Sequence, residues 1–227
     1  MRALFAELMG RSTGICGGRG GSQHIHWRNF YSNGVQGGIV PIATGMALAE
    51  KRKGKDTSVT VFIGDGTFGE GVIYEAFNMA SLWQVPLLIV VENNHIAQTT
   101  PSEFALAGSI SQRFEAFGIP AVELDTSDVL EIATEASQLY AEVHEELSPR
   151  ALILNTERFG PHSKGDDTRP EEVVAAIKEQ RDPLKISEAR LPAEAVRVVD
   201  SEVEEEVRLA FEQALADPPA KFEEDIL

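Results

Sequence analysis

The sequence of 227 residues contains one cysteine, Cys16. A single cysteine cannot form a disulfide within the chain, and it cannot supply the several thiolates of a metal cluster. Long apolar runs are also absent, because the longest, residues 85–91, includes Pro86 and is far shorter than the roughly 20 residues of a membrane-spanning helix. The first residues, MRALFAELMGR, are too mixed in character for a secretory signal peptide. We therefore expect a reducing, cytoplasmic compartment.

Basic residues are few. The chain has 20 Lys and Arg against 36 Asp and Glu, which gives a formal net charge of −16. Such a charge repels nucleic-acid backbones and anionic lipid, and the basic residues do not cluster with aromatic ones. We expect neither nucleic acid nor a membrane surface as a partner. Many of the acidic residues lie in residues 194–227, which form either a solvated helix face or a docking face.

Two kinds of segment alternate from residue 39 onward. Apolar residues recur at helical spacing in residues 41–50, 70–83 and 128–146, and strand-like runs occupy residues 59–63, 87–91, 121–125 and 151–156. The run 87–91 is apolar throughout, as is typical of a central parallel strand that is covered on both faces. The alternation predicts an α/β fold with a mainly parallel sheet of at least four strands and helices on both faces.

The two ends of the chain differ from this core. Glycine is concentrated in residues 10–38, which indicates either close backbone approach or disorder. After Thr156 the polar stretch ERFGPHSKGDDTRP has no periodicity and predicts a loop, and Pro170 starts a helix. Ser201 and Glu204 have the spacing of a capping box, which predicts a last helix from there to about residue 216. We divide the chain into a glycine-rich loop region (1–38), an α/β core (39–169) and a C-terminal helical extension (170–227).

Two short motifs follow neighbouring strands of the predicted sheet. Gly64-Asp65-Gly66 ends one buried strand, and Asn93-Asn94 ends the next, with residues 67–92 between them. Ligands of open α/β sheets bind at the carboxyl ends of the strands. A carboxylate and an amide oxygen suit Mg²⁺, and a helix that opens near Gly69 offers backbone N–H groups to a phosphate. Each motif alone is a common turn, but the pair at this spacing predicts a binding site.

The spacing of Gly-Asp-Gly and Asn-Asn resembles the fingerprint of thiamine-diphosphate enzymes. The segment IGDGTFGEGVIYEAFNMASLWQVPLLIVVENN is similar to the α-type chain of the E1 component of 2-oxo acid dehydrogenases of the pyruvate, acetoin and branched-chain types. Further resemblances lie in AELMGRSTGICGGRGGSQHIH, NGVQGGIVPIATGMALA, ERFGPHS and RDPLKISEARL. Together they cover most of residues 1–216 in the order of that family. The resemblance implies the thiamine-diphosphate-binding fold.

The resemblance also implies the cofactors, thiamine diphosphate and Mg²⁺, and the residues that hold them. Asp65 and Asn94 are expected to bind Mg²⁺ through side-chain oxygens and Ile96 through its carbonyl. The remaining residues expected to bind the cofactor are Gly64, Gly66 and Thr67 at the diphosphate, Gly34 and Gln36 at the aminopyrimidine ring, and Arg158 facing the diphosphate.

Two histidines acquire catalytic roles from the same resemblance. His162 occupies the position of the active-site loop histidine, which works near the reactive carbon of the cofactor and the substrate. His24 lies at the family's GGSxH position and is expected to line the substrate entrance. Without the resemblance, the simpler interpretation of a histidine in such a loop is an exposed residue without a catalytic role.

The resemblance implies partners as well. The glutamate that activates the aminopyrimidine comes from a β-type chain in this family, so we expect such a partner here. The helices over 41–50 and 70–83 either form the interface with it or simply cover the sheet. Family members also carry an N-terminal segment with a Tyr-Arg pair, which this sequence lacks. Either the sequence is a fragment, or a separate polypeptide supplies that segment, and we take the second as a hypothesis. The acyl acceptor is expected to be a lipoyl group or another carrier protein.

The resemblance therefore predicts an E1-type α subunit that, with its partner, decarboxylates a 2-oxo acid and transfers the acyl or hydroxyalkyl group to an acceptor. Two alternatives stay open. One is a split transketolase-like enzyme that transfers ketol units between sugars, and the other is a non-catalytic scaffold subunit. The ERFGPHS segment disfavours the first, and the retained Asp65, Asn94, Arg158 and His162 disfavour the second.

Overall fold

The computed structural model describes residues 1–54, 56–163, 165 and 167–221. The chain forms two compact units, one made of Met1–Gly34 with Leu191–Leu227 and the other of Val35–Arg190. We call them the terminal unit and the sheet unit. These units differ from the three regions predicted from the sequence, 1–38, 39–169 and 170–227. They differ because the two ends of the chain pack together into one unit.

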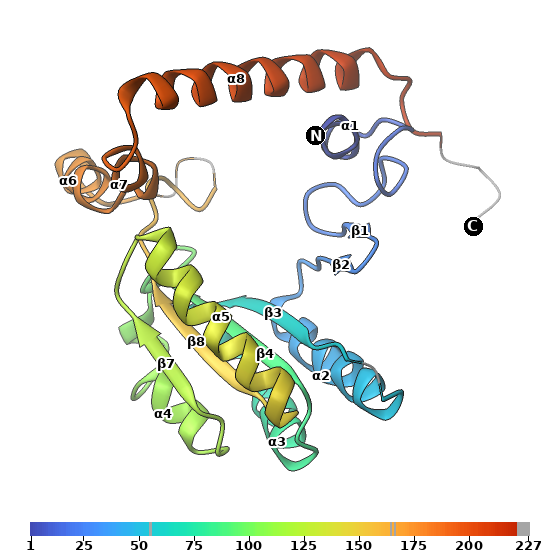
Figure 1. Cartoon of the computed structure of the whole chain (residues 1–227), viewed down its shortest axis with the longest axis vertical. Helices are drawn as coiled ribbons and strands as arrows, with labels where there is room; N and C mark the ends of the chain where they lie inside the picture. Colours follow the sequence, from blue (N-terminus) through green and yellow to red (C-terminus); the bar gives the residue numbers. More distant parts are fainter. Residues whose placement is uncertain (55, 164, 166, 222–227) are drawn as a thin grey trace. The chain divides into compact units, whose positions relative to one another are not determined.

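The sheet unit is built on four parallel strands: β3 (Val59–Gly64), β4 (Leu87–Asn93), β7 (Ala121–Leu124) and β8 (Arg150–Asn155). Their order in the sheet is β3-β4-β8-β7, as Figure 1 shows. Gly64 lies opposite Glu92, and Asn93 lies opposite Asn155, so the strands end at a common edge. The four strands predicted from the sequence are confirmed, each within two residues.

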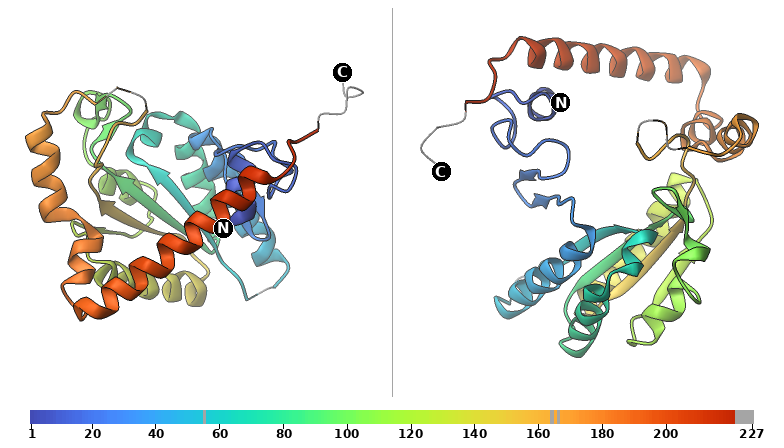
Figure 2. Two further views of the ribbon diagram at one scale, coloured as in Figure 1. Left: turned by 90° about the horizontal axis from the view of Figure 1, so that it is seen from above. Right: turned by 180° about the vertical axis from the view of Figure 1, so that it is seen from behind.

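Helices cover both faces of this sheet. On one face lie α2 (Gln36–Arg52), α3 (Gly71–Leu82) and α4 (Ile110–Glu115), which share a core with the inward side chains of β3, β4 and β8. On the other face α5 (Val129–Glu146) packs against β4 and β8. Figure 1 has α5 in front of the sheet, and the right-hand view of Figure 2 has the other three helices in front. The predicted α/β fold is thus confirmed.

Predicted helix starts are confirmed at two places. Asp128 caps α5, where its side chain accepts a hydrogen bond from the Leu130 N–H, and Pro170 precedes α6 (Glu171–Arg181). Short elements complete the sheet unit. They are the 3₁₀ helices η1 (Asp65–Gly69) and η2 (Ser102–Phe104), the strands β5 (Ile96–Ala97) and β6 (Thr100–Pro101), and the helix α7 (Pro183–Glu188).

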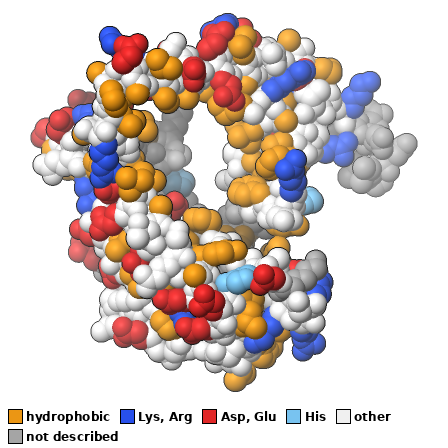
Figure 3. Space-filling view, in the orientation of Figure 1, with side chains coloured by type: hydrophobic (Ala, Val, Ile, Leu, Met, Phe, Trp, Pro, Cys, Tyr) orange, Lys and Arg blue, Asp and Glu red, His pale blue; other side chains and the backbone are white. Residues whose placement is uncertain are grey.

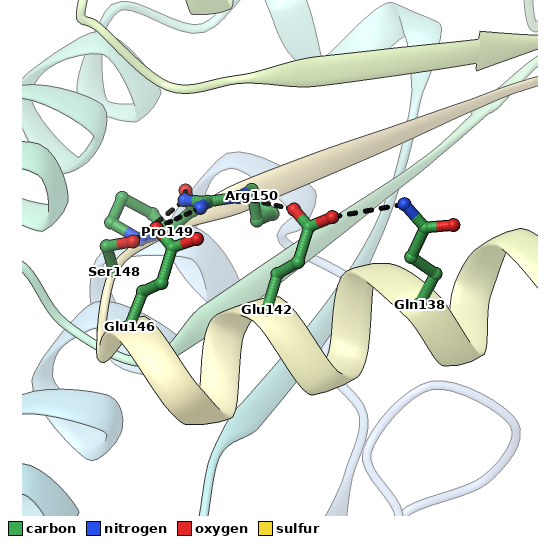
Figure 4. A network of polar contacts seen from close by, with 6 residues as sticks. All are labelled: Gln138, Glu142, Glu146, Ser148, Pro149 and Arg150. Carbon is green, nitrogen blue, oxygen red and sulfur yellow. Dashed lines mark hydrogen bonds and ion pairs between the residues drawn. The ribbon is translucent and has the colours of Figure 1, made fainter.

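A buried arginine joins the end of α5 to the start of β8. Arg150 is only 6% exposed, and its guanidinium donates to Glu142 at 3.0 Å, to the Ser148 hydroxyl at 2.7 Å and also to Glu146. Figure 4 shows this network, in which the carboxylates come from successive turns of α5. Because α5 ends at Leu147 in a left-handed conformation, the chain reverses there and brings Arg150 back beside the helix.

The terminal unit pairs the two ends of the chain. Helix α1 (Arg2–Leu8) packs on α8 (Ala193–Ala216), where Phe5 meets Phe211 edge to face at 5.9 Å. The buried carboxylate of Asp217 accepts hydrogen bonds from Arg2 and Thr13. The unit also contains the small hairpin of β1 (His26–Trp27) and β2 (Phe30–Tyr31). Among the described residues, none of the helices is long and apolar enough to cross a membrane.

The prediction that the last helix starts at Ser201 is wrong. Helix α8 begins at Ala193, after Pro192, and Ser201 lies in its interior. The capping-box spacing occurs by chance on the exposed side of a longer helix, and Pro192 provides the real start because proline is tolerated there. The end at Ala216 is confirmed. Figure 3 shows acidic side chains interspersed with hydrophobic ones along α8. The exposed acidic residues of this helix are Glu194, Asp200, Glu202, Glu204, Glu205, Glu206 and Glu212.

Candidate functional site

The candidate site lies at the carboxyl edge of the sheet, where β3 and β4 end. The Gly-Asp-Gly motif leaves β3 directly into η1, so that Asp65 is the first residue of a 3₁₀ turn and is 3% exposed. Helix α3 starts shortly after, at Gly71, close to the predicted position. A carboxylate buried at this depth needs partners to offset the loss of its hydration.

One such partner is Ser102, which the sequence pattern did not reveal. Its hydroxyl donates a hydrogen bond to Asp65, and its N–H donates to the His95 carbonyl at 2.9 Å. His95 follows Asn94 directly and has a positive φ of 60°. Ser102 therefore ties the Gly-Asp-Gly turn to the segment that carries Asn94, and it brings two predicted metal ligands to the same place.

Asn94 and Ile96 lie on the same side of the β5–β6 hairpin. The Ile96 N–H donates to Oδ1 of Asn94 at 3.1 Å. Ile96 lies opposite Pro101 in the hairpin. The Ser102 N–H donates to the His95 carbonyl, which makes Ile96 and Pro101 a pair without hydrogen bonds to each other. In such a pair the N–H and the carbonyl of a residue point away from the partner strand. The Ile96 carbonyl therefore points to the side on which Asn94 lies, as a shared metal site requires.

The two asparagines of the Asn-Asn motif do different work. Asn93 is 6% exposed, and its amide donates to the Asn155 side chain at 2.8 Å, which in turn donates to Glu123 at 2.9 Å. This chain of hydrogen bonds crosses β4, β8 and β7 at the edge of the sheet. Asn93 is thus used to join strands, and Asn94 is the asparagine that remains suited to binding a ligand.

Gln36 reaches the site from the first turn of α2. Its side-chain oxygen accepts a hydrogen bond from the Thr67 hydroxyl at 2.8 Å, and Thr67 is 2% exposed. A Cβ on Gly64 would lie 3.6 Å from the same Gln36 oxygen. The structure therefore brings together Gly64, Thr67 and Gln36, which the sequence separates by about 30 positions.

Glycine is required at position 66 for a steric reason. A Cβ on Gly66 would lie 2.7 Å from Cβ of Ala97 in β5, which is closer than two carbon atoms can approach. The backbone of the Gly-Asp-Gly turn is therefore packed directly against the Ala97 side chain of the hairpin. A larger residue would push Ile96 away from Asp65.

Arg158 lies at the same hairpin. Its Nη1 donates to the carbonyl of Gln98 at 2.9 Å. Its Nε and Nη2 are buried and have no hydrogen-bond partner. Buried guanidinium N–H groups without an acceptor are costly, and an anion is the group that satisfies them best. This orphaned pair of donors is the most direct sign in the structure that an anionic ligand binds here.

The loop that contains Arg158 and His162 is closed by a second arginine. Nη2 of Arg169 donates to the carbonyl of Arg158 at 2.8 Å and to Asp167 at 2.7 Å. The Arg169 guanidinium lowers the pKa of Asp167 to about 2, so the pair stays ionised at neutral pH. His162 lies between these anchors and is exposed. Its predicted role near the substrate stays a prediction.

Two predicted residues belong to the terminal unit. His24 is exposed in the glycine-rich loop, and its N–H donates to the Gly20 carbonyl at 3.1 Å. A Cβ on Gly34 would lie 2.5 Å from Oε1 of Gln23. The structure describes both residues within their own unit, and their roles toward substrate and aminopyrimidine stay predictions.

The residues at the sheet edge fit Mg²⁺ and a diphosphate. Asp65, Asn94 and the Ile96 carbonyl are hard oxygen donors, and Mg²⁺ completes its octahedron with water and phosphate oxygens. Arg158 supplies two unsatisfied donors to the anion. Among the described residues, no three His, Cys, Asp or Glu side chains cluster as a metal site, so a metal here depends on the amide, the carbonyl and the ligand itself.

Comparison with known proteins shows the family of the chain. The model of the protein family described as "Dehydrogenase E1 component" matches residues 1–223. The chain is 34% identical to the somatic mitochondrial pyruvate dehydrogenase E1 component subunit alpha of Rattus norvegicus over 99% of its own length and 60% of that protein. For the E1 subunit alpha of Rickettsia typhi the identity is 36%, over 92% of this chain and 68% of the relative.

A third relative, the pyruvate dehydrogenase E1 subunit alpha of Zymomonas mobilis, is 35% identical over 98% of this chain and 66% of its own length. Among solved structures, a transketolase from Campylobacter jejuni aligns with 56% of this chain at a TM-score of 0.47 and 21% identity. The chain thus spans roughly two thirds of the length of the relatives it matches, and 60% of the rat protein. With the match over residues 1–223, the chain belongs to the dehydrogenase E1 component family.

Proposed function

We propose that this chain is an E1-type α subunit that binds thiamine diphosphate with Mg²⁺ and, together with a β-type partner, decarboxylates a 2-oxo acid. The observation that carries the proposal is the sheet edge itself, where the buried Asp65 carboxylate and the Asn94 amide oxygen lie beside the β5–β6 hairpin. Arg158 is bonded to the same hairpin and has two guanidinium nitrogens without a hydrogen-bond partner. Family membership supports the identity of the cofactor. The names of the relatives favour pyruvate as the first substrate to test.

The residues of the site divide the binding of the cofactor among them. Asp65, Asn94 and the Ile96 carbonyl hold Mg²⁺, which neutralises part of the diphosphate charge. Arg158 donates from its unpaired Nε and Nη2 to the diphosphate, and Gly66 lets the backbone approach it. Gln36, held by Thr67, presents the first turn of α2 to the ring system.

When bound, thiamine diphosphate supplies the carbanion that adds to the keto carbon and takes up the electrons left when CO₂ departs. The protein must hold the substrate and exclude water around this chemistry. We assign to His162 the transfer or holding of a proton at the substrate oxygen, because histidine is the side chain that most often serves as a general acid or base in catalysis. His24 lines the entrance for the substrate.

The partner completes the site. Although α2 and α3 cover the sheet with one face, their other faces expose apolar side chains, of which Leu82 is 73% and Ile42 is 54% exposed. Such side chains are a candidate surface for the β-type chain. The acyl acceptor, a lipoyl group or another carrier, and the cytoplasmic location stay predictions.

The proposal is tested by reconstitution. The chain is produced together with the products of neighbouring genes, and CO₂ release is followed with thiamine diphosphate and Mg²⁺ over a panel of 2-oxo acids that starts with pyruvate. We expect decarboxylation by the complex and none by a complex that carries Asp65→Asn. Arg197→Gln, on the exposed side of α8, serves as a matched control and should leave the rate unchanged.

The same experiment separates the two alternatives. A new ketose from sugar phosphates, without CO₂ from any 2-oxo acid, would indicate a transketolase-like transfer. A stable complex that neither binds the cofactor nor releases CO₂ would indicate a scaffold subunit. A His162→Ala variant refines the second case, since a scaffold has no activity for this substitution to remove.

A further inference from the structure

The glycine-rich loop of the terminal unit is organised around a buried carboxylate that has no role in the function proposed above. Glu7 lies in α1 and is 1% exposed. Its Oε2 accepts hydrogen bonds from the N–H groups of Cys16 at 2.6 Å and Gly18 at 2.9 Å. Its Oε1 accepts a hydrogen bond from the Gly20 N–H at 2.6 Å.

A chain segment that curls its N–H groups around one point forms a concave anion site. Here the anion is supplied by the protein itself. Burial acts to raise the pKa of Glu7, but the backbone N–H groups of Gly18, Cys16, Gly20 and Gly21 outweigh it and leave the pKa lowered. The carboxylate is therefore ionised at neutral pH, and charge-assisted hydrogen bonds of this kind are among the strongest in proteins.

The glycines of the loop are those that this wrapping requires. A Cβ on Gly14 would lie 2.4 Å from Oε2 of Glu7, and one on Gly20 would lie 2.1 Å from the His24 carbonyl. Gly18 has a φ of +75°, and its Cβ would lie 2.4 Å from the Arg11 carbonyl. The close approach that the glycine content predicted is thus an approach to Glu7 and to the loop itself.

The same loop leads directly to His24. The Gly20 carbonyl accepts a hydrogen bond from the His24 N–H at 3.1 Å, so the residue whose N–H binds Glu7 also closes the turn that presents the histidine. Beyond it, the Ser32 hydroxyl accepts from the Ile25 N–H at 2.9 Å and donates to the Gln23 carbonyl at 3.1 Å. The turn at His24 is therefore fixed from both sides, and Glu7 is the anchor on one of them.

We infer that Glu7 is the positioning residue of the glycine-rich loop, and that its carboxylate fixes the backbone of residues 14–21 and thereby the place of His24. The consequence for catalysis rests on the proposed function, in which His24 lines the substrate entrance. The consequence for the loop does not depend on it. Glu7 itself touches neither substrate nor cofactor in this account.

The loop is tested first in the full chain by amide hydrogen exchange. Glu7→Gln keeps the size of the side chain but replaces one acceptor oxygen with an NH₂ group that faces N–H donors. We expect the Gly18 and Gly20 amides to exchange at least about tenfold faster in this variant, and the His24 ring signals to shift. Glu204→Gln, an exposed position of α8, is the matched control and should change neither.

Chemical rescue gives a second test of the same point. Glu7→Ala removes the atoms of one acetate ion beyond Cβ and leaves the N–H groups in place. We expect added sodium acetate to restore the slow exchange of Gly18 and Gly20, whereas sodium chloride at equal ionic strength does not. Equal effects of the two salts, or exchange in Glu7→Gln that matches the wild type, would overturn the inference.

Kinetics of the reconstituted complex test the link to His24. We expect Glu7→Gln to lower kcat/KM for the 2-oxo acid at least about tenfold and to change the Kd of thiamine diphosphate less than about twofold. In a His24→Ala background the same substitution should cause no further loss, because the two residues act as one unit. Losses that multiply in the double variant would show that Glu7 does not act through His24.

The outcomes stay separable. If the wild-type complex does not decarboxylate any 2-oxo acid, the proposed function fails, and the exchange and rescue experiments still decide the role of Glu7. If neither variant folds, exchange in the wild-type chain decides it. The Cys16, Gly18 and Gly20 amides must then be protected, and rapid exchange at all three would contradict the inference.

Discussion

At the scale of single residues, Arg158 indicates most specifically which kind of ligand the site binds, namely an anion. A guanidinium that donates only one of its buried N–H groups to the protein holds the others ready for an acceptor. The sequence resemblance placed Arg158 at the diphosphate. The structure adds that both Nε and Nη2 are buried without a hydrogen-bond partner, whereas Arg11, Arg113 and Arg181 each have only Nε in that state.

Removing this guanidinium should therefore weaken cofactor binding. We predict that Arg158→Met raises the Kd of thiamine diphosphate about 10- to 100-fold, since a hydrogen bond to a charged group contributes about 1.5–3 kcal/mol. Isothermal titration calorimetry of the reconstituted complex measures this. Arg197→Gln is the control, because Arg197 pairs with Glu194 on the exposed side of α8. An unchanged Kd in Arg158→Met would place the diphosphate elsewhere.

The residues of the site differ in how well their roles can be predicted from the sequence. Asp65 and Asn94 stand out because strand ends impose a fixed spacing on them. Ser102 and Glu7 do not, because a serine after a proline and a glutamate in a short helix are ordinary surface residues in sequence terms. Only the packing of the hairpin, and of the glycine-rich loop, brings their partners from elsewhere in the chain.

At the scale of elements, the junction of α5 and β8 depends on Arg150. Its guanidinium is buried, while its acidic partners Glu142 and Glu146 are 35% and 57% exposed in their side chains. Water can solvate these carboxylates when the arginine is removed, so the loss is smaller than for a fully buried pair.

We predict that Arg150→Met lowers the free energy of unfolding by about 2 kcal/mol, through the lost hydrogen bonds and the stranded Ser148 hydroxyl. Urea denaturation of the full chain measures the change. Arg208→Met is the control, because Arg208 makes its ion pairs with Glu205 and Glu212 on the surface of α8 and should contribute much less. Equal losses in both variants would mean that burial at Arg150 is irrelevant to stability.

The N-terminus of α5 should make stability depend on pH. The Arg190 guanidinium and the Leu130 N–H lower the pKa of Asp128 from 3.8 to about 2. A carboxyl group whose pKa is lower in the folded state stabilises the fold above its unfolded pKa, and this contribution is lost as pH falls through the folded value.

We predict that the wild-type chain loses stability between about pH 3.8 and pH 2 through this group, and that Asp128→Asn lacks this part of the loss. Asparagine still caps the helix, so the comparison isolates the charge. Thermal unfolding followed over this pH range measures it. Parallel stability curves for the two proteins would contradict the assignment of the pKa shift to Asp128.

The elements were predictable where one period persists. The sequence shows apolar runs at β3, β4, β7 and β8 and apolar stripes at α2, α3 and α5. These patterns are recognisable because the side chains concerned face the cores between the sheet and its helices. The start of α8 was not, since a capping-box pattern also arises on the exposed face of a longer helix. The 3₁₀ turn after Gly64 and the β5–β6 hairpin were not predictable either, because two-residue strands carry no period.

At the scale of the whole molecule, the comparisons show the family of the chain, and the structure shows how its residues are divided between two units. The two ends of the chain, which the sequence suggests treating separately, form one unit through α1, α8 and Asp217. No pattern in the sequence predicts this, because the contacts join residues that lie about 200 positions apart. The strands and helices of the sheet unit, by contrast, follow from local patterns in the sequence.

The net charge of −16 also belongs to this scale. Only part of it lies on α8, which carries seven exposed acidic side chains and two arginines. Because the chain is so acidic, we propose that Mg²⁺ and Asp65, with Arg158, are central to binding the diphosphate. If this is right, a neutral residue at position 65 must abolish binding without disturbing the fold.

The most direct test is a calorimetric titration of thiamine diphosphate, with Mg²⁺ present, into the chain combined with its β-type partner, for the wild type and for Asp65→Asn. Asparagine can still accept the hydrogen bond from Ser102, so the hairpin keeps its place. The account predicts binding by the wild type and at least about 100-fold weaker binding by the variant in an equally stable complex. Equal affinity in the two complexes would contradict a cofactor site at the ends of β3 and β4.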